Sequence, residues 1–234
     1  MIPIGDNLPQ RSRPIITYGL IGLSIGLFFW ELQLETPALS DFLQTWAVVP
    51  VKMTALVQDA IAGRFLALPF LIAPLLVSLF LHQGWAHLLG NLLFLRVFGA
   101  RVEATLGHGA FLAFFVVTGI LTRSLQVLLD PASQAAFVGA NGAIAAVLSA
   151  YLTSFPRAKI DSILPLIVIF LPIELPAWVY LFGWVGQQII SGWGSFSLPD
   201  GINPLSVTGW GQAIGLLLGA VWVKPKLRNT QPAD

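Results

Sequence analysis

Two histidines and an asparagine lie close together in an otherwise apolar stretch, in the pattern His82-x4-His87-x3-Asn91. On a helix, His87 and Asn91 share a face because residues four apart are neighbours. His82 precedes Gly84 and is predicted to lie on the loop that leads into this helix. These side chains could hold neighbouring helices together through hydrogen bonds, or they could line a functional site. No metal site is predicted, because an i, i+5 spacing on a helix would point the two histidines apart.

Two further polar positions interrupt later apolar segments. One segment opens with Gly139-Ala140-Asn141-Gly142. Asparagine is a preferred N-cap residue and glycine permits a sharp turn, so this pattern predicts a capped helix start. The other position is Gln212, beside a ridge formed by Gly211, Gly215 and Gly219. Such a ridge lets a second helix approach closely, and the Gln212 amide would seek a partner on it.

The composition places these positions in a membrane protein. Of the 234 residues, 56% are hydrophobic and 10% are charged, and the mean hydropathy is +0.80. A soluble domain carries about 25% charged residues. The net charge of +1 gives no basic surface for nucleic acid. The absence of cysteine excludes disulfides, thiolate metal sites and a cysteine nucleophile.

The apolar segments predict an all-α, polytopic bundle with six transmembrane helices, since a span needs about 20 apolar residues. The predicted spans are 15–32, 85–100, 110–129, 139–155, a fifth that begins near 172–176, and 207–223. Residues 33–64 are expected to lie on the membrane interface, and 65–81 to form a loop and half-helix. The first half of 163–190 is expected to be extended. Residues 15–223 are therefore treated as one membrane domain, flanked by segments 1–14 and 224–234.

The distribution of basic residues predicts that both termini are cytoplasmic. One side would hold eight basic residues: Arg11, Arg13, Arg101, Arg157, Lys159, Lys224, Lys226 and Arg228. The other side would hold three: Lys52, Arg64 and Arg123. The expected location is the plasma (inner) membrane, as a multi-pass protein.

Taken in order, these motifs resemble the rhomboid family of intramembrane serine proteases. The similarity includes the His82-x4-His87-x3-Asn91 pattern, Val102-Glu103, Phe155-Pro156-Arg157 and Glu174-Leu175-Pro176-Ala177-Trp178. By this resemblance, His82, His87 and Asn91 would line the site, with His82 and Asn91 helping to hold an oxyanion. In that family the fourth helix begins Gly-x-Ser-Gly, with serine as nucleophile, and the sixth helix supplies a histidine base.

This chain departs from the family pattern at both catalytic positions. Asn141 stands where the resemblance implies the serine, between Gly139 and Gly142, and Gln212 stands where it implies the histidine. A carboxamide is neither a nucleophile nor a useful base at neutral pH. Ser149 lies two turns beyond Asn141 and has no evident base at its level. We therefore expect Asn141 and Gln212 to hydrogen-bond to each other rather than to catalyse.

The sequence thus favours an inactive, rhomboid-like protein that binds transmembrane segments of other membrane proteins within the lipid bilayer. It requires no cofactor or metal. One alternative is an active intramembrane serine protease whose dyad has been altered in this chain. Another is a small transporter, suggested by broken helices and polar groups within spans.

Overall fold

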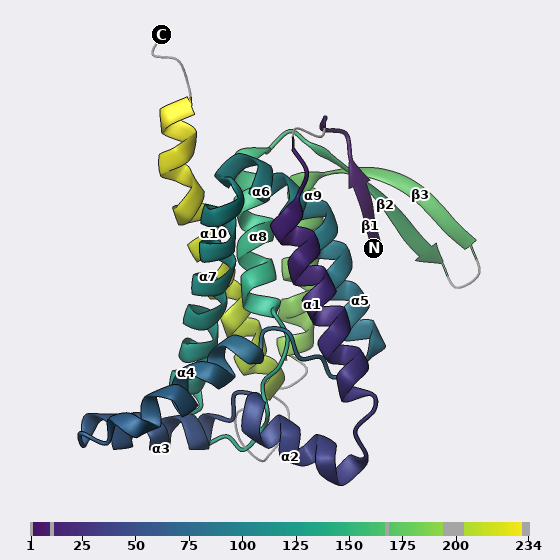
Figure 1. Cartoon of the computed structure of the whole chain (residues 1–234). Helices are drawn as coiled ribbons and strands as arrows, with labels where there is room; N and C mark the ends of the chain where they lie inside the picture. The colour runs from purple at the N-terminus through teal and green to yellow at the C-terminus, as the bar shows by residue number, and fades with distance from the viewer. Residues whose placement is uncertain (1, 10–11, 167–168, 194–203, 231–234) are drawn as a thin grey trace.

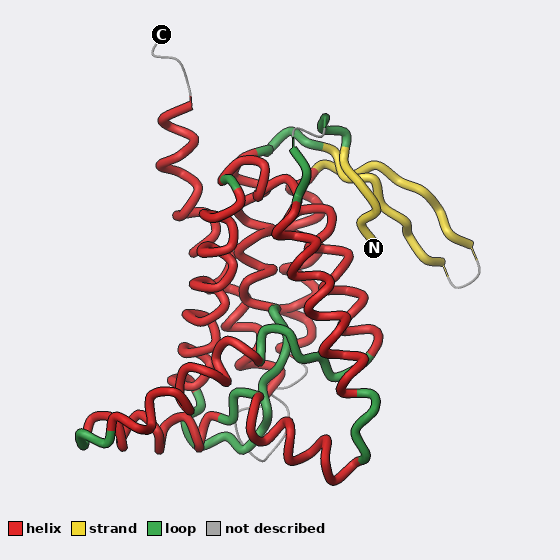
Figure 2. The backbone as a smooth tube through the Cα atoms, in the orientation of Figure 1, coloured by secondary structure: helices red, strands yellow, loops and turns green. Residues whose placement is uncertain are grey.

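A bundle of helices with a small sheet at one end forms the protein (Figures 1 and 2). The computed structural model describes residues 2–9, 12–166, 169–193 and 204–230. The bundle helices follow the predicted order: α1 (Ile15–Glu31), α5 (Trp85–Phe94), α7 (His108–Leu129), α8 (Asn141–Ser154), α9 (Ala177–Trp193) and α10 (Pro204–Thr230). Within the described part of the chain, α7 alone is long and apolar enough to cross a membrane by itself. The six-span topology therefore stays a prediction.

Several predicted helix boundaries move. The second span does not end near residue 100: α5 continues through a π-helical turn, η2 (Leu95–Gly99), into α6 (Ala100–Leu106). This continuous helix ends at Leu106, and the next residue, Gly107, has φ +83°. The fourth helix begins at Asn141 rather than 139. The sixth, α10, extends beyond the predicted 207–223 in both directions.

Helix α8 is the centre of the bundle. Every side chain from Ala143 to Tyr151 is buried, and α8 contacts α5, α6, α7, α9 and α10. Small residues dominate this helix, so its neighbours approach closely. A Cβ at Gly215 of α10 would lie 2.2 Å from the Gly142 carbonyl oxygen, and one at Gly219 would lie 2.0 Å from that of Ala146. Gly215 and Gly219 of the predicted ridge therefore lie where α10 approaches the backbone of α8 closely.

The segment before the second span lies across one end of the bundle (Figure 1). It consists of α2 (Thr36–Trp46), α3 (Pro50–Ile61), a 3-10 turn η1 (Phe65–Ala67) and α4 (Leu68–Val77). The predicted half-helix over 65–81 is present as η1 and α4. Backbone bonds between Val48 and Phe137 tie this segment to the chain just before α8, at 2.8 and 3.2 Å.

The expectation of an all-α fold is wrong at the opposite end of the molecule. There β1 (Ile2–Asp6), β2 (Lys159–Leu166) and β3 (Ile169–Pro176) form an antiparallel sheet in the order β1-β2-β3. Prolines within β2 and β3 disfavour helix formation. The strands agree with the extended conformation predicted for part of this segment. Glu174 pairs with Lys159 across the hairpin at 3.5 Å.

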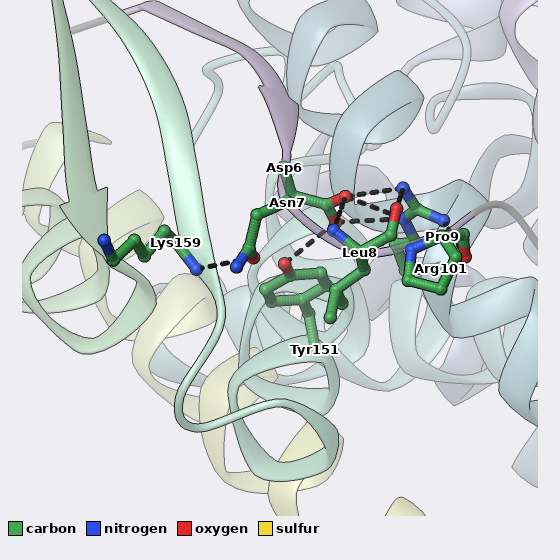
Figure 3. A network of polar contacts seen from close by, with 7 residues as sticks. All are labelled: Asp6, Asn7, Leu8, Pro9, Arg101, Tyr151 and Lys159. Carbon is green, nitrogen blue, oxygen red and sulfur yellow. Dashed lines mark hydrogen bonds and ion pairs between the residues drawn. The ribbon is translucent and has the colours of Figure 1, made fainter.

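A polar network fastens β1 to the bundle (Figure 3). The Asp6 carboxylate accepts hydrogen bonds from Arg101 Nε at 2.9 and 3.0 Å and from the Tyr151 hydroxyl at 2.9 Å. The Lys159 amide donates to Asn7 Oδ1 at 3.0 Å. Residues 6 and 7 therefore connect α6, α8 and the start of β2.

Candidate functional site

The His82 side chain is fixed by bonds at both ring nitrogens. His82 lies on the predicted loop before α5 and is buried. Its Nδ1 donates to the Phe80 carbonyl at 3.0 Å, and its Nε2 accepts from Asn91 Nδ2 at 3.1 Å. The two bonds define the tautomer, with the proton on Nδ1. In this arrangement Nε2 faces Asn91 as an acceptor.

His87 lies beside His82 and reaches α8. The two rings have centroids 5.1 Å apart in an edge-to-face arrangement, so the expectation that they point apart is wrong. That expectation applied helical spacing to both residues, which does not hold because His82 lies on the loop and only His87 belongs to α5. His87 Nε2 donates to Asn141 Oδ1 at 3.0 Å. Together the residues form two imidazole–amide pairs, His82 with Asn91 and His87 with Asn141.

Asn141 is the first residue of α8 and does not cap it. The N-cap residue is Ala140, and the Asn141 side chain makes no capping hydrogen bond. The predicted capping role is therefore wrong, because the side chain turns towards His87 instead. The expected hydrogen bond between Asn141 and Gln212 is also not formed. Gln212 is buried on α10, and its Oε1 has no hydrogen-bond partner in the described part of the chain.

Glycine is required at two points where α8 begins. Gly139 has φ +89°, and a Cβ there would lie 2.5 Å from the His87 ring. A Cβ at Gly142 would lie 2.1 Å from Thr122 Oγ1 on α7. The Gly139 amide donates to the Ser78 carbonyl at 2.8 Å. The turn is thus held close to α5, α7 and the end of α4.

Arg123 of α7 supports this turn and was missed as a site residue. Arg123 was expected with Lys52 and Arg64 among the basic residues on one side of the membrane, whereas its side chain is buried. It donates from Nη2 to the Gly139 carbonyl and from Nη1 to Gln126 Oε1 at 2.8 Å. Gln126 in turn packs against Gly211, where a Cβ would lie 2.4 Å from its Nε2. The sequence did contain a signal for this role. Arg123 lies inside an apolar span, three positions before Gln126, and charged residues inside spans usually face the bundle interior.

Glu31, at the end of α1, is a second missed neighbour of the site. It is buried, and its Oε2 accepts the His82 backbone amide at 3.3 Å. Its Oε1 has no hydrogen-bond partner within the described residues. No group of three or more histidine or acidic side chains suited to a metal ion occurs among these residues.

The arrangement places polar side chains of α5, α8 and α10 within the helix bundle. A comparison with protein families matches residues 71–229 to the Rhomboid domain. The chain belongs to the rhomboid family. It is therefore a membrane protein, and the match includes all of the candidate site residues predicted from the sequence.

Individual relatives agree with this assignment. The chain is 28% identical over 189 residues to Rhomboid protein 1, mitochondrial, of Saccharomyces cerevisiae, covering 77% of this chain and 47% of the yeast protein. It is 32% identical over 143 residues to Rhomboid protease GluP of Bacillus subtilis, covering 61% of this chain and 25% of that protein. It is 32% identical over 148 residues to RHOMBOID-like protein 5 of Arabidopsis thaliana, covering 63% and 43%. The chain thus spans less than half the length of each of these relatives.

Proposed function

We propose that this rhomboid-family chain is a pseudoprotease that binds transmembrane segments of other membrane proteins without hydrolysing them. The observation that carries the proposal is the identity of two residues: carboxamides, Asn141 and Gln212, stand where the family resemblance implies a nucleophile and a base. In serine proteases, loss of either member of a cooperating serine–histidine pair lowers kcat on the order of a millionfold. The proposed location is the plasma membrane, although the yeast relative's name is mitochondrial.

The contacts of Asn141 support this proposal. Its Oδ1 is engaged by His87 Nε2 at 3.0 Å, so the amide acts as a hydrogen-bond acceptor within the bundle. Hydrogen bonds of this kind between membrane helices contribute about 0.6–2 kcal/mol. Ser149 is buried farther along α8 and does not offer a replacement nucleophile at the start of the helix.

The deciding experiment restores the dyad. We expect the Asn141→Ser/Gln212→His double variant to react with a fluorophosphonate probe and to cleave a fluorogenic transmembrane substrate. Asn141→Ser alone should do neither. A serine side chain is one bond shorter than asparagine, so its hydroxyl would fall short of His87, and Gln212 would still provide no base.

The unaltered chain is the control in the same assay. Cleavage by that chain, with a covalent adduct on one of its side chains, would favour an active protease and contradict the proposal. Binding is tested separately by photocrosslinking from exposed positions on α5 and α9, such as Leu89 and Phe182. Capture of transmembrane peptides by the unaltered chain supports the binding role, and failure to retain any such peptide contradicts it.

A further inference from the structure

A second site lies at the end of the bundle that carries β1, away from the polar cluster around His87. A pocket of about 240 Å³ opens between β1, the segment that leads into α1, and the helix formed by η2 and α6. We propose that this pocket binds the phosphate of an anionic glycerophospholipid, with Arg96 as its main cationic contact. This inference does not depend on the proposed pseudoprotease role.

Among the described residues, one cation of the pocket has no ion-pair partner. Arg101 is paired with the Asp6 carboxylate at 2.5 Å and also donates to the Pro9 carbonyl at 2.9 Å. Arg96 also lines the pocket and is exposed. No hydrogen bond or ion pair joins Arg96 to any other described residue. The pocket therefore presents a free guanidinium, whose planar donors suit a phosphate.

Hydroxyl groups and the position of the pocket favour a lipid headgroup. Ser12 and Tyr18 line the same pocket, and both side chains are exposed. Tyrosine is enriched at the membrane–water interface, and a long arginine side chain near a span end extends towards that interface. Basic pockets between transmembrane helices bind phospholipid headgroups in this way.

A strip of bare backbone next to the pocket provides a path for an acyl chain. Gly19, Gly22 and Gly26 follow Tyr18 on one exposed face of α1. A Cβ at any of these glycines would meet no atom within 4 Å. A lipid whose phosphate contacts Arg96 could therefore lay a chain along α1. A soluble phosphate compound would gain nothing from this strip.

The test measures lipid binding to the purified full chain in neutral detergent, by native mass spectrometry and thermal unfolding. The ligands are dioctanoyl phosphatidylglycerol, dioctanoyl phosphatidylcholine and glycerol 3-phosphate. The variants are Arg96→Gln, Arg96→Lys and the matched control Arg157→Gln, which removes an exposed arginine outside the pocket. We expect phosphatidylglycerol to bind best, and Arg96→Gln to weaken its binding about fivefold, the effect of one interfacial arginine.

The remaining variants assign the effect to charge at this position. Arg157→Gln should bind phosphatidylglycerol like the unaltered chain, and Arg96→Lys should bind it better than Arg96→Gln. Equal loss in Arg96→Gln and Arg157→Gln would overturn the proposal in favour of diffuse attraction. The proposal would also be overturned if the unaltered chain bound phosphatidylcholine or glycerol 3-phosphate as tightly as it binds phosphatidylglycerol. Unfolding temperatures without lipid check that each variant is folded.

Discussion

At the residue scale, the turn before α8 determines how the polar side chains meet. Gly139 combines a left-handed backbone with close contact to the His87 ring, while its carbonyl accepts from buried Arg123. A buried carbonyl that loses such a donor costs about 1–3 kcal/mol. The imidazole–amide pair between His87 and Asn141 thus depends on a backbone position that only glycine fits.

We predict that Gly139→Ala destabilises the protein by more than Gly63→Ala. Both glycines have positive φ, +89° and +83°, so both variants incur backbone strain of about 1–3 kcal/mol. A Cβ at Gly63 meets nothing within 4 Å, whereas one at Gly139 overlaps His87. The overlap should add about 1–3 kcal/mol. Unfolding free energies in detergent measure the difference, and equal losses would contradict the described packing.

At the element scale, local sequence patterns were sufficient to predict the position of long apolar helices. They were insufficient to predict the pairing of segments that are distant in the sequence. The positions of α1, α7 and α8 were predicted to within a few residues because each is a continuous apolar run bounded by polar or turn residues. The β1–β2 pairing joins residues such as Pro3 and Ser162, and no short-range pattern in the sequence encodes it.

The candidate site shows the same division between local and long-range information. The sequence identified His82, His87 and Asn91 as one cluster by their types and spacing, and only the family resemblance placed Asn141 at the same site. It did not predict which residues bond. The choice of His87 as the partner of Asn141 depends on how α5 and α8 pack, and the side-chain geometry of that contact appears only in three dimensions.

The packing of α10 on α8 yields a prediction with a control of opposite sign. Gly219→Ala should weaken or displace α10, because the added Cβ would lie 2.0 Å from a backbone oxygen of α8. Gly22→Ala on α1 meets open space and should be neutral or stabilising by about 0.5–1 kcal/mol, since alanine is the better helix former. Thermal unfolding of the two variants decides. Matching shifts would mean that α10 does not contact α8 closely.

At the scale of the whole molecule, the two ends of the bundle are built differently. One end carries the helices α2 and α3, and the other carries the sheet and the N-terminal segment (Figure 1). Because Arg123 is buried, only Lys52 and Arg64 remain as basic residues expected on the other side, which strengthens the bias of basic residues towards the sheet end. The predicted orientation therefore places the sheet in the cytoplasm.

The absence of cysteine permits a direct test of this orientation. Ser12 lies near the sheet end and Ser40 lies on α2, and both are exposed. In intact bacterial cells, a membrane-impermeant maleimide should label Ser40→Cys, and should label Ser12→Cys only after permeabilisation. The unaltered chain provides a background without thiols. Labelling of Ser12→Cys alone in intact cells would reverse the assigned orientation.

The contacts of Asp6 with Arg101, Tyr151 and strand β2 have a consequence for synthesis of the protein. Asp6 leaves the ribosome before its partners Arg101 and Tyr151, and its strand partner Ile160 follows much later. At about 5–20 residues per second, the interval between synthesis of Asp6 and of Ile160 lasts roughly 8–30 seconds. Throughout this time the first strand has no neighbour, while the intervening helices are already entering the bilayer. Closure of the sheet thus follows synthesis of α1 to α8, and it joins β1 to helices that have already been made.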